Sequence, residues 1–191
     1  VSNVANMIDL LDADQFMAAQ KEVQDFYNTD ANADNDISDA DLQKMDYGAN
    51  TNWQEEIYRT AISQRHNVSL SGGSENTTFH ASMGYQDQEG VVKTSGLEKI
   101  NGKLNGSVTG IDDKLKISTN LSFANINQSR APIGETSGAQ GDAINNALGL
   151  NPTLPVYNDD GTYFQLDPNN RNPLAMINLM DDNTETNRIL G

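Results

Sequence analysis

The sequence contains no cysteine, which removes three classes of site at once. A disulfide framework, a zinc site built on thiolates and a cysteine nucleophile all need that residue. The sequence also has no run of about 18 apolar residues, so it predicts no membrane-spanning helix. A membrane-spanning β-strand stays open, because such a strand carries apolar side chains only at alternate positions and its mean hydropathy is therefore polar.

Basic residues are scarce as well: 12 Lys and Arg stand against 27 Asp and Glu, for a formal net charge of −15. Long-range repulsion would oppose an encounter with nucleic acid or with anionic lipid headgroups, so we expect neither as a partner. No Ser stands in a nucleophile elbow, and neither His66 nor His80 has a second His or Cys at metal-ligand spacing. We therefore expect no enzymatic activity.

The charge distribution divides the 191 residues into two parts. Residues 1–56 contain 13 acidic and 2 basic side chains, whereas residues 57–191 contain 14 and 10. This contrast predicts an acidic helical head that gives way, near residues 49–52, to a nearly balanced β body. Val1 is not a start methionine and no basic-then-apolar signal segment opens the chain, so we expect part of a longer protein.

Three helices are expected in the acidic head. Asp12 and Gln15 form a capping-box pattern ahead of the first helix, a second helix is expected from Ser38 or Asp39, and a third after Asn52. The apolar positions at helical spacing are Phe16, Ala19, Val23 and Phe26, then Leu42 and Met45, then Trp53, Ile57 and Ala61. We expect these stripes to pack against the body.

After His66 the apolar period changes from 3.6 to 2, which predicts β-strands. Residues 68–70, 78–85, 99–108 and 115–123 each alternate, so that Phe79, Leu104 and Leu121 are expected on apolar faces and Lys103 and Asn120 on polar ones. Tight turns at 71–76 and 110–113 alternate with longer connections at 86–96 and after Asn125. Strands of roughly 9–11 residues joined in this way are typical of an outer-membrane β-barrel. Periodicity alone leaves a soluble β-sandwich equally open.

The long connection from about residue 126 to 183 has its own predicted structure. We expect a short helix at 142–148, a hairpin around Asp160 and Gly161, and a helix that Asn172 caps and Pro173 begins. A loop of this length with internal structure is usually a functional one.

Several stretches, in this order, resemble the SusC/RagA family of TonB-dependent outer-membrane transporters. They are NWQEEIYRTA (52–61), HNVSLSGG (66–73), ASMGY (81–85), DQEG (87–90), SG (95–96), NPTLPVYN (151–158), DGTY (160–163) and NPL (172–174). The resemblance covers about residues 50–191. It implies the fold class all-β, with antiparallel strands that form part of a transmembrane β-barrel, together with an α-helical acidic insertion and a long structured loop.

The same resemblance implies a function and a set of partners. Family members import glycans or peptides through a plugged barrel in the bacterial outer membrane, with energy from the TonB complex and with a SusD-like surface lipoprotein as a lid. This sequence contains neither the plug nor an energy-coupling motif, and its four or five strands leave two unpaired edges. Since unpaired amides are costly in a bilayer, the strands must pair with the remainder of the barrel, surrounded by outer-membrane lipid. No substrate-contacting residue can be carried over.

The acidic head also contains a calcium-loop pattern, residues 30–41, that is similar to an EF-hand and more closely to a dockerin loop. The expected ligands are Asp30, Asn32, Asp34, Asp36 (through its backbone carbonyl), Ser38 and Asp41. Two departures stand in this loop: Asn35 replaces the usual Gly, and the closing Asp41 is shorter than Glu. Clustered carboxylates favour a cation, because they repel one another without a counter-charge. A solvated acidic linker is the alternative.

Together these patterns give one interpretation and one alternative. Residues 1–50 are predicted as the acidic helical insertion with the calcium loop, 51–125 as the first barrel strands and hairpins, and 126–191 as a long extracellular loop and the start of the next strand. Phe79, Leu104 and Leu121 would face lipid, and Lys103 and Asn120 the lumen. The alternative is a secreted calcium-binding β-sandwich module for adhesion or glycan binding.

Overall fold

The protein is described by a computed structural model that covers residues 1–29, 37–112, 114–134 and 141–191. The chain divides into two compact units. The first, called the sheet unit, consists of residues 1–3, 59–131 and 181–191, and the second, called the helical unit, consists of residues 4–58 and 132–180. Each unit is therefore assembled from segments that lie far apart in the sequence.

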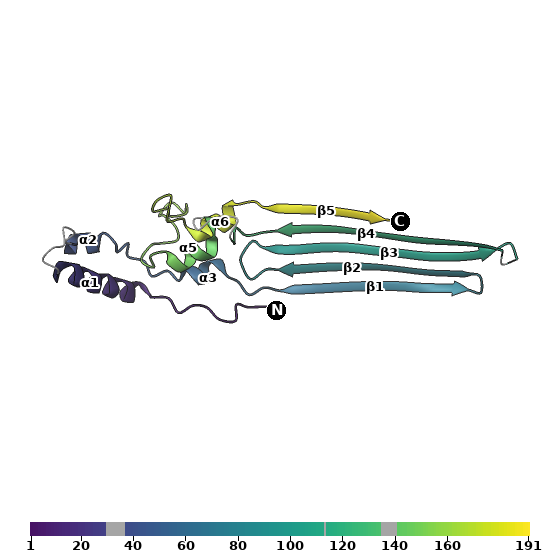
Figure 1. Ribbon diagram of the computed structural model, residues 1–191, viewed down its shortest axis with the longest axis horizontal. Coiled ribbons are helices and arrows are strands. Elements are labelled where there is room, and N and C mark those ends of the chain that lie inside the picture. Colours follow the sequence, from purple (N-terminus) through teal and green to yellow (C-terminus); the bar gives the residue numbers. More distant parts are fainter. Residues whose placement is uncertain (30–36, 113, 135–140) are drawn as a thin grey trace. The chain divides into compact units, whose positions relative to one another are not determined.

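The sheet unit contains one five-stranded antiparallel sheet whose strands lie in chain order (Figure 1). Its strands are β1 (Ser63–Ser74), β2 (Thr77–Glu89), β3 (Gly96–Gly110), β4 (Leu115–Ser129) and β5 (Asn183–Leu190). The predicted antiparallel strands are confirmed. The predicted lengths of 9–11 residues are too short for β1, β2, β3 and β4, which have 12, 13, 15 and 15 residues, because the alternation continues through the less apolar residues at their ends.

The connections alternate in length as predicted. Only Glu75 and Asn76 join β1 to β2, and a four-residue turn joins β3 to β4. In that turn Ile111 and Asp112 have φ angles of 57° and 51°, the positive values that tight hairpin turns use to match the twist of their strands. At the other end of the sheet, residues 90–95 join β2 to β3, and residues 130–182 join β4 to β5.

Among the described residues, the helical unit has one helix of 17 residues, α1 (Ala13–Thr29), and four short ones: α2 (Asp39–Gln43), α3 (Trp53–Ile57), α5 (Ala143–Gly149) and α6 (Pro173–Leu179). They confirm the five predicted helices, but α2 and α3 end at Gln43 and Ile57, so Met45 and Ala61 of the predicted stripes lie outside them. Side chains of Ser38, Asn52, Asp142 and Asn172 accept hydrogen bonds from the first free amides of α2, α3, α5 and α6, which is the usual way to begin a short helix. Within the described ranges, no helix is long and apolar enough to cross a bilayer.

The core of the helical unit forms where α3, α5 and α6 pack together. Its most deeply buried side chains are Trp53, Ile57, Leu154, Ile177, Asn172 and Thr153. Residues 45–54 are tied to residues 151–154 by hydrogen bonds: the Trp53 indole N–H donates to the Asn151 carbonyl at 3.1 Å, and the Thr51 hydroxyl donates to the Leu154 carbonyl at 2.6 Å. These contacts bring together two segments about 100 residues apart in sequence.

The prediction that the apolar stripe of α1 packs against the body is wrong at two positions. Val23 is 41% exposed and Phe26 is 74% exposed. The buried residue of α1 is Gln24 instead, whose side-chain amide donates to the Ile37 carbonyl at 2.9 Å and to Asp39 at 3.0 Å. This polar contact turns the Gln24 side of the helix inward. Met45 of the second stripe is also exposed, whereas Leu42 is buried.

Asn172 provides a direct test of the helical unit, because it is 1% exposed and all its polar atoms are used. Its Nδ2 donates to the carbonyls of Val156 (2.8 Å) and Phe164 (3.1 Å), and its Oδ1 caps α6. We predict that Asn172→Ala lowers the free energy of unfolding by about 3 kcal/mol, since it removes two part-buried hydrogen bonds to the Val156 and Phe164 carbonyls together with the cap of α6. Urea unfolding, followed by fluorescence of the single Trp53, measures this.

The matched control is Asn170→Ala, in the same loop but exposed. It should change the free energy of unfolding by no more than about 0.5 kcal/mol. Equal effects of the two substitutions would show that Asn172 does not hold the loop and α6 together.

Candidate functional site

The candidate functional site is the sheet, whose register separates two chemically different faces. Leu104 is paired with Ala81 on one side and Leu121 on the other, and Phe79 lies two residues from Ala81 on the same face. Lys103 is paired with Ser82 and Ser122, and Asn120 lies two residues from Ser122. Because successive side chains of a strand point to opposite faces, the register confirms the predicted separation of Phe79, Leu104 and Leu121 from Lys103 and Asn120.

We call the first surface the apolar face, and it is uncovered. Phe79, Leu104 and Leu121 are 42%, 46% and 42% exposed. The other exposed large apolar side chains of this face are Val68, Leu70, Met83, Val108, Leu115, Ile117, Phe123 and Ile189. The described residues form a single sheet, so they supply no second sheet over this face, as the β-sandwich alternative requires.

The apolar face has the height of a hydrocarbon layer. It extends along β3 from Ile100 to Gly110, which at about 3.3 Å per residue is about 33 Å. A strand tilted by about 40° spans about 25 Å of that length along the membrane normal, which is the height of the apolar band of membrane barrels. At the end with the long connections, the face changes to a polar row across the strands, formed by Gln64, Asp87, Glu98, Asn127 and Glu185.

The opposite surface, called the polar face, consists mainly of amides, hydroxyls and basic groups. Gly84 lies in its middle, between Asn67 and Asn101. The amide groups of both Asn side chains lie 2.8–3.2 Å from the place where a Cβ of residue 84 would be. The missing side chain therefore leaves room for two amides over the strand, a feature that alternation alone does not predict.

On the apolar face, glycines likewise leave room for the side chains of neighbouring strands. The ring of Phe123 lies over Gly102, with its Cε1 2.2 Å from where a Cβ would be, and the ring of Phe79 lies over Gly72 in the same way. Neighbouring strands thus supply the apolar surface that the glycines lack. Gly106 differs, because a Cβ there would meet only the Thr78 carbonyl at 3.7 Å.

Three of the stretches that carry the family resemblance meet around Arg59. Its guanidinium donates to the carbonyls of Gly90 (3.1 Å) and Ser95 (2.9 Å) and lies 3.7 Å from the Glu89 carboxylate. Its backbone N–H donates to Val91 at 2.8 Å. The same residues close the connection between β2 and β3, so their first role is to hold the loop in place.

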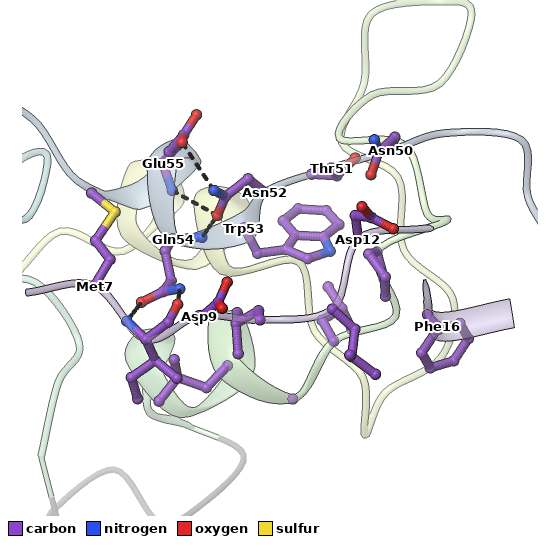
Figure 2. A pocket seen from close by; sticks show the side chains of 17 residues that line it. Met7, Asp9, Asp12, Phe16, Asn50, Thr51, Asn52, Trp53, Gln54 and Glu55 are labelled. Atoms are coloured by element: carbon purple, nitrogen blue, oxygen red, sulfur yellow. Dashed lines mark hydrogen bonds between the residues drawn. The ribbon is translucent and has the colours of Figure 1, made fainter. Parts of the chain in front are cut away.

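A pocket in the helical unit lies between residues 7–16, the start of α3 and the end of α5, as Figure 2 shows. It has a volume of about 700 Å³. Gln54 fixes its wall by accepting from the Ile8 backbone N–H at 3.1 Å and donating to the Ile8 carbonyl at 2.7 Å. The titratable side chains that line it are all acidic: Asp9, Asp12 and Glu55. No local sequence pattern links Ile8 to Gln54, so this pocket is not predictable from the sequence alone.

The predicted calcium ligands are described only in part. Asp30, Asn32, Asp34 and Asp36 lie outside the described residues. Ser38 and Asp41 are described and lie together, with the Ser38 hydroxyl 2.7 Å from Asp41 Oδ2. Lys44 Nζ lies 2.8 Å from Asp41 Oδ1. Hydrogen bonds from Lys44 and Ser38 lower the pKa of Asp41 to about 2, so its carboxylate is ionised at neutral pH.

Elsewhere in the described ranges, no three His, Cys, Asp or Glu side chains are grouped as a metal site. His66 and His80, which have no metal-ligand spacing in the sequence, lie on different faces. His66 stacks on Tyr85 with ring centres 6.5 Å apart, on the apolar-face side, and His80 is on the polar face beside Asn105.

Comparison with known proteins points to one group. No family model matches the chain. The TonB-dependent receptor SusC of Bacteroides thetaiotaomicron is 32% identical over 166 residues, which cover 75% of this chain and 16% of the receptor. TonB-dependent receptor P3 of Formosa agariphila is 34% identical over 167 residues, which cover 85% of this chain and 15% of the receptor. The chain thus spans about a sixth of the length of these relatives.

Two solved structures have the same fold. They are the RagAB peptide importer in its closed-closed state (TM-score 0.54, 22% identity) and the RagAB peptide transporter (TM-score 0.55, 19% identity). Each match covers 85% of this chain and 20% of the other. These relatives and neighbours are named as receptors and transporters, none as an enzyme, in agreement with the prediction of no catalytic role.

The contacts of the sheet glycines generate a prediction. We expect Gly102→Ala to lower the free energy of unfolding of the sheet by about 1–2 kcal/mol, because the new methyl group displaces the Phe123 ring. Gly106→Ala, on the same strand and face, should have little effect, since its Cβ meets the Thr78 carbonyl only at ordinary contact distance. The temperature at which the β-sheet circular dichroism is lost measures both. A larger effect at position 106 would contradict the close contact of Phe123 with Gly102.

Proposed function

This chain is a SusC/RagA-like part of a TonB-dependent receptor of the bacterial outer membrane, and from that premise we propose that β1–β5 form a section of the wall of its transport barrel. In this proposal the apolar face meets outer-membrane lipid and the polar face lines the lumen. The observation that carries it is the uncovered apolar face, with Phe79, Leu104 and Leu121 all exposed. A soluble protein rarely leaves so large an apolar surface bare.

The open edges of the sheet require further strands. Every residue of β1 is exposed, and β5 is paired on one side only. In a bilayer, an unpaired backbone amide or carbonyl costs several kcal/mol, so both edges must be hydrogen-bonded. We propose that they pair with the remainder of the barrel.

The alternating connections give the proposed wall a direction. Bacterial barrels have short periplasmic turns and long extracellular loops. The turn after β1 and the turn after β3 would therefore be periplasmic, and residues 90–95 and 130–182 extracellular. Residues 130–182 contain α5, α6 and the buried side chains Leu154 and Ile177. The proposed extracellular loop therefore has a folded core of its own.

The wall would serve an importer of glycans or peptides. We propose energy transfer from the TonB complex through a plug elsewhere in the protein, and a SusD-like surface lipoprotein as a lid over the long loops. Support comes from the family of the relatives and from the RagAB neighbours, whose names state that they import or transport peptide. The motif residues around Arg59 and Trp53 hold loops by internal hydrogen bonds, so we assign them no contact with cargo.

Cysteine accessibility tests this proposal, and the absence of native cysteine from these 191 residues makes it simple. In the full-length receptor, carrying no other cysteine and embedded in its membrane, we predict that Lys103→Cys reacts with a water-soluble maleimide and that Leu104→Cys does not. The physical reason is that a thiol in hydrocarbon neither ionises nor meets the reagent. Glu75→Cys, in the turn, is the control for labelling at an aqueous site.

The opposite pattern, with Leu104→Cys labelled and Lys103→Cys protected, would show that the two faces are assigned the wrong way round. Equal labelling of both would contradict a membrane-embedded wall.

We also propose that residues 30–41 bind calcium, with the support of the ligand pattern of Asp30, Asn32, Asp34, Asp36, Ser38 and Asp41. The adjacent Ser38 and Asp41 oxygens fit the end of such a loop. Lys44 competes with the ion, because its ammonium group is paired with the Asp41 carboxylate.

This competition is measurable. We predict that Lys44→Met strengthens calcium binding about two- to fivefold, the range expected when one exposed ion pair no longer competes. Lys21→Met is the control, since Lys21 pairs with Asp25 on α1, outside the loop. Isothermal titration of the full-length receptor with calcium measures both. If neither the native protein nor the variants show a heat of binding on calcium addition, whether released or absorbed, the segment is a solvated acidic linker.

A further inference from the structure

The charges of the sheet are completely segregated between its two faces. Within β1–β5 the polar face carries five basic side chains and no carboxylate; they are Arg65, Lys99, Lys103, Lys116 and Arg188. The apolar-face positions carry the carboxylates and no basic group; these are Asp87, Glu89, Glu98 and Glu185. A chain of net charge −15 thus presents a purely basic surface on one side of its sheet.

These cations are free to act on a solute. The ion pairs within the described ranges involve Lys21, Lys44 and Arg59, and none of the five basic groups of the polar face. Arg65, Lys103, Lys116 and Arg188 are exposed, and Lys99 is half-buried. No described carboxylate neutralises them, so their field extends from the surface.

Four of the five lie within three successive rows of the polar face, toward the end with the long connections. Arg65 and Lys99 share one row across the sheet, separated by Gln86, so their Cα atoms are about 10 Å apart at the usual strand spacing. Arg188 lies in the next row of the same face and Lys103 in the one after it, at steps of about 7 Å. Three successive rows therefore each hold a positive charge.

Amides and hydroxyls fill the positions between these charges. Asn67 and Asn101 lie in the Arg188 row, with their amides over Gly84. Ser69, Ser82 and Ser122 lie in the Lys103 row. Such groups both donate and accept hydrogen bonds, as the hydroxyl groups of a sugar require. The polar face of the strands has no Phe, Tyr or Trp, and its one aromatic ring is the imidazole of His80.

We propose that this basic strip binds an acidic oligosaccharide as it enters the barrel, through ion pairs to its carboxylate or sulfate groups and through hydrogen bonds from the Asn and Ser side chains to its hydroxyls. The proposal rests on the proposed function, because it takes the polar face to line the lumen. Charge complementarity decides the class of cargo: a neutral glycan would gain nothing from four clustered cations, and a cationic solute would be repelled. The cations lie toward the proposed extracellular end of the strands, where an incoming solute arrives first.

Binding of three hexameric probes to the purified full-length receptor tests this. The probes are an oligogalacturonate, the neutral maltohexaose and hexaglutamate, measured by isothermal titration at low and at high salt. We expect the native receptor to bind the oligogalacturonate most tightly, and the Lys99→Gln, Lys103→Gln, Arg188→Gln triple variant to lose about tenfold in that affinity. Its salt dependence should fall as well, because fewer ion pairs are screened.

Two control variants separate the strip from charge in general. Lys114→Gln removes one positive charge from the turn after β3, and Glu98→Gln removes a negative charge from the other face; neither should alter oligogalacturonate affinity. Circular dichroism of the triple variant shows whether its sheet is intact. The exposed positions of Lys103 and Arg188 predict that it is.

Each contrary outcome overturns the proposal in its own way. Failure to bind oligogalacturonate, or equal affinity for maltohexaose, would exclude selection by charge. Tighter binding of hexaglutamate would assign the strip to acidic peptide instead. An equal loss for all probes, together with leakage of large solutes, would show that the cations hold the plug. If Lys103→Cys is accessible to the water-soluble maleimide and any of these results is also obtained, the proposed barrel wall is retained. Only the assignment of the cargo is then rejected.

Discussion

Antiparallel pairing of β1–β5 in one continuous register is the constraint on which the rest of the structure depends. Because side chains alternate along every strand and partners share a face, one register fixes the environment of all five strands together. A slip of one residue in β3 would exchange Leu104 with Lys103 and place a charge among Leu121 and Phe79. The apolar face, the polar face and the charge segregation are three consequences of this single pairing.

The helical unit depends on a different kind of interaction, hydrogen bonds between distant segments. Trp53 and Thr51 bond to residues 151–154, and Asn172 joins the start of α6 to the hairpin at Val156 and Phe164. Short helices of five to seven residues have little stability of their own. Capping side chains and these long-range hydrogen bonds supply the stability that helix propensity alone does not. The family-like motifs at 52–61, 151–158 and 172–174 are thus explained as loop architecture, whereas those at 66–73 and 81–85 lie on β1 and β2.

Sequence reasoning predicted the elements well and their surroundings less well. Alternation of two residues predicted which side chains share a face, and capping patterns predicted where α1 and α6 begin, because both signals are local. The stripe of α1 misled at Val23 and Phe26, since a polar contact of Gln24 with Ile37 and Asp39 decides which side is buried. No local sequence pattern predicts the hydrogen bond between Ile8 and Gln54 or the one between Trp53 and Asn151. The segregation of charge follows from the sequence only when the register of all five strands is known, because the register decides which residues share a face.

The central claim is that this sheet is a curved piece of a larger cylinder, with hydrocarbon on one side and water on the other. A structure of the full-length receptor in a lipid nanodisc tests it most directly. The account predicts that β1 and β5 each pair with a further strand of a closed barrel, and that Phe79, Leu104 and Leu121 point outward into lipid. A second protein layer packed over those three side chains, with β1 and β5 left as free edges, would contradict it.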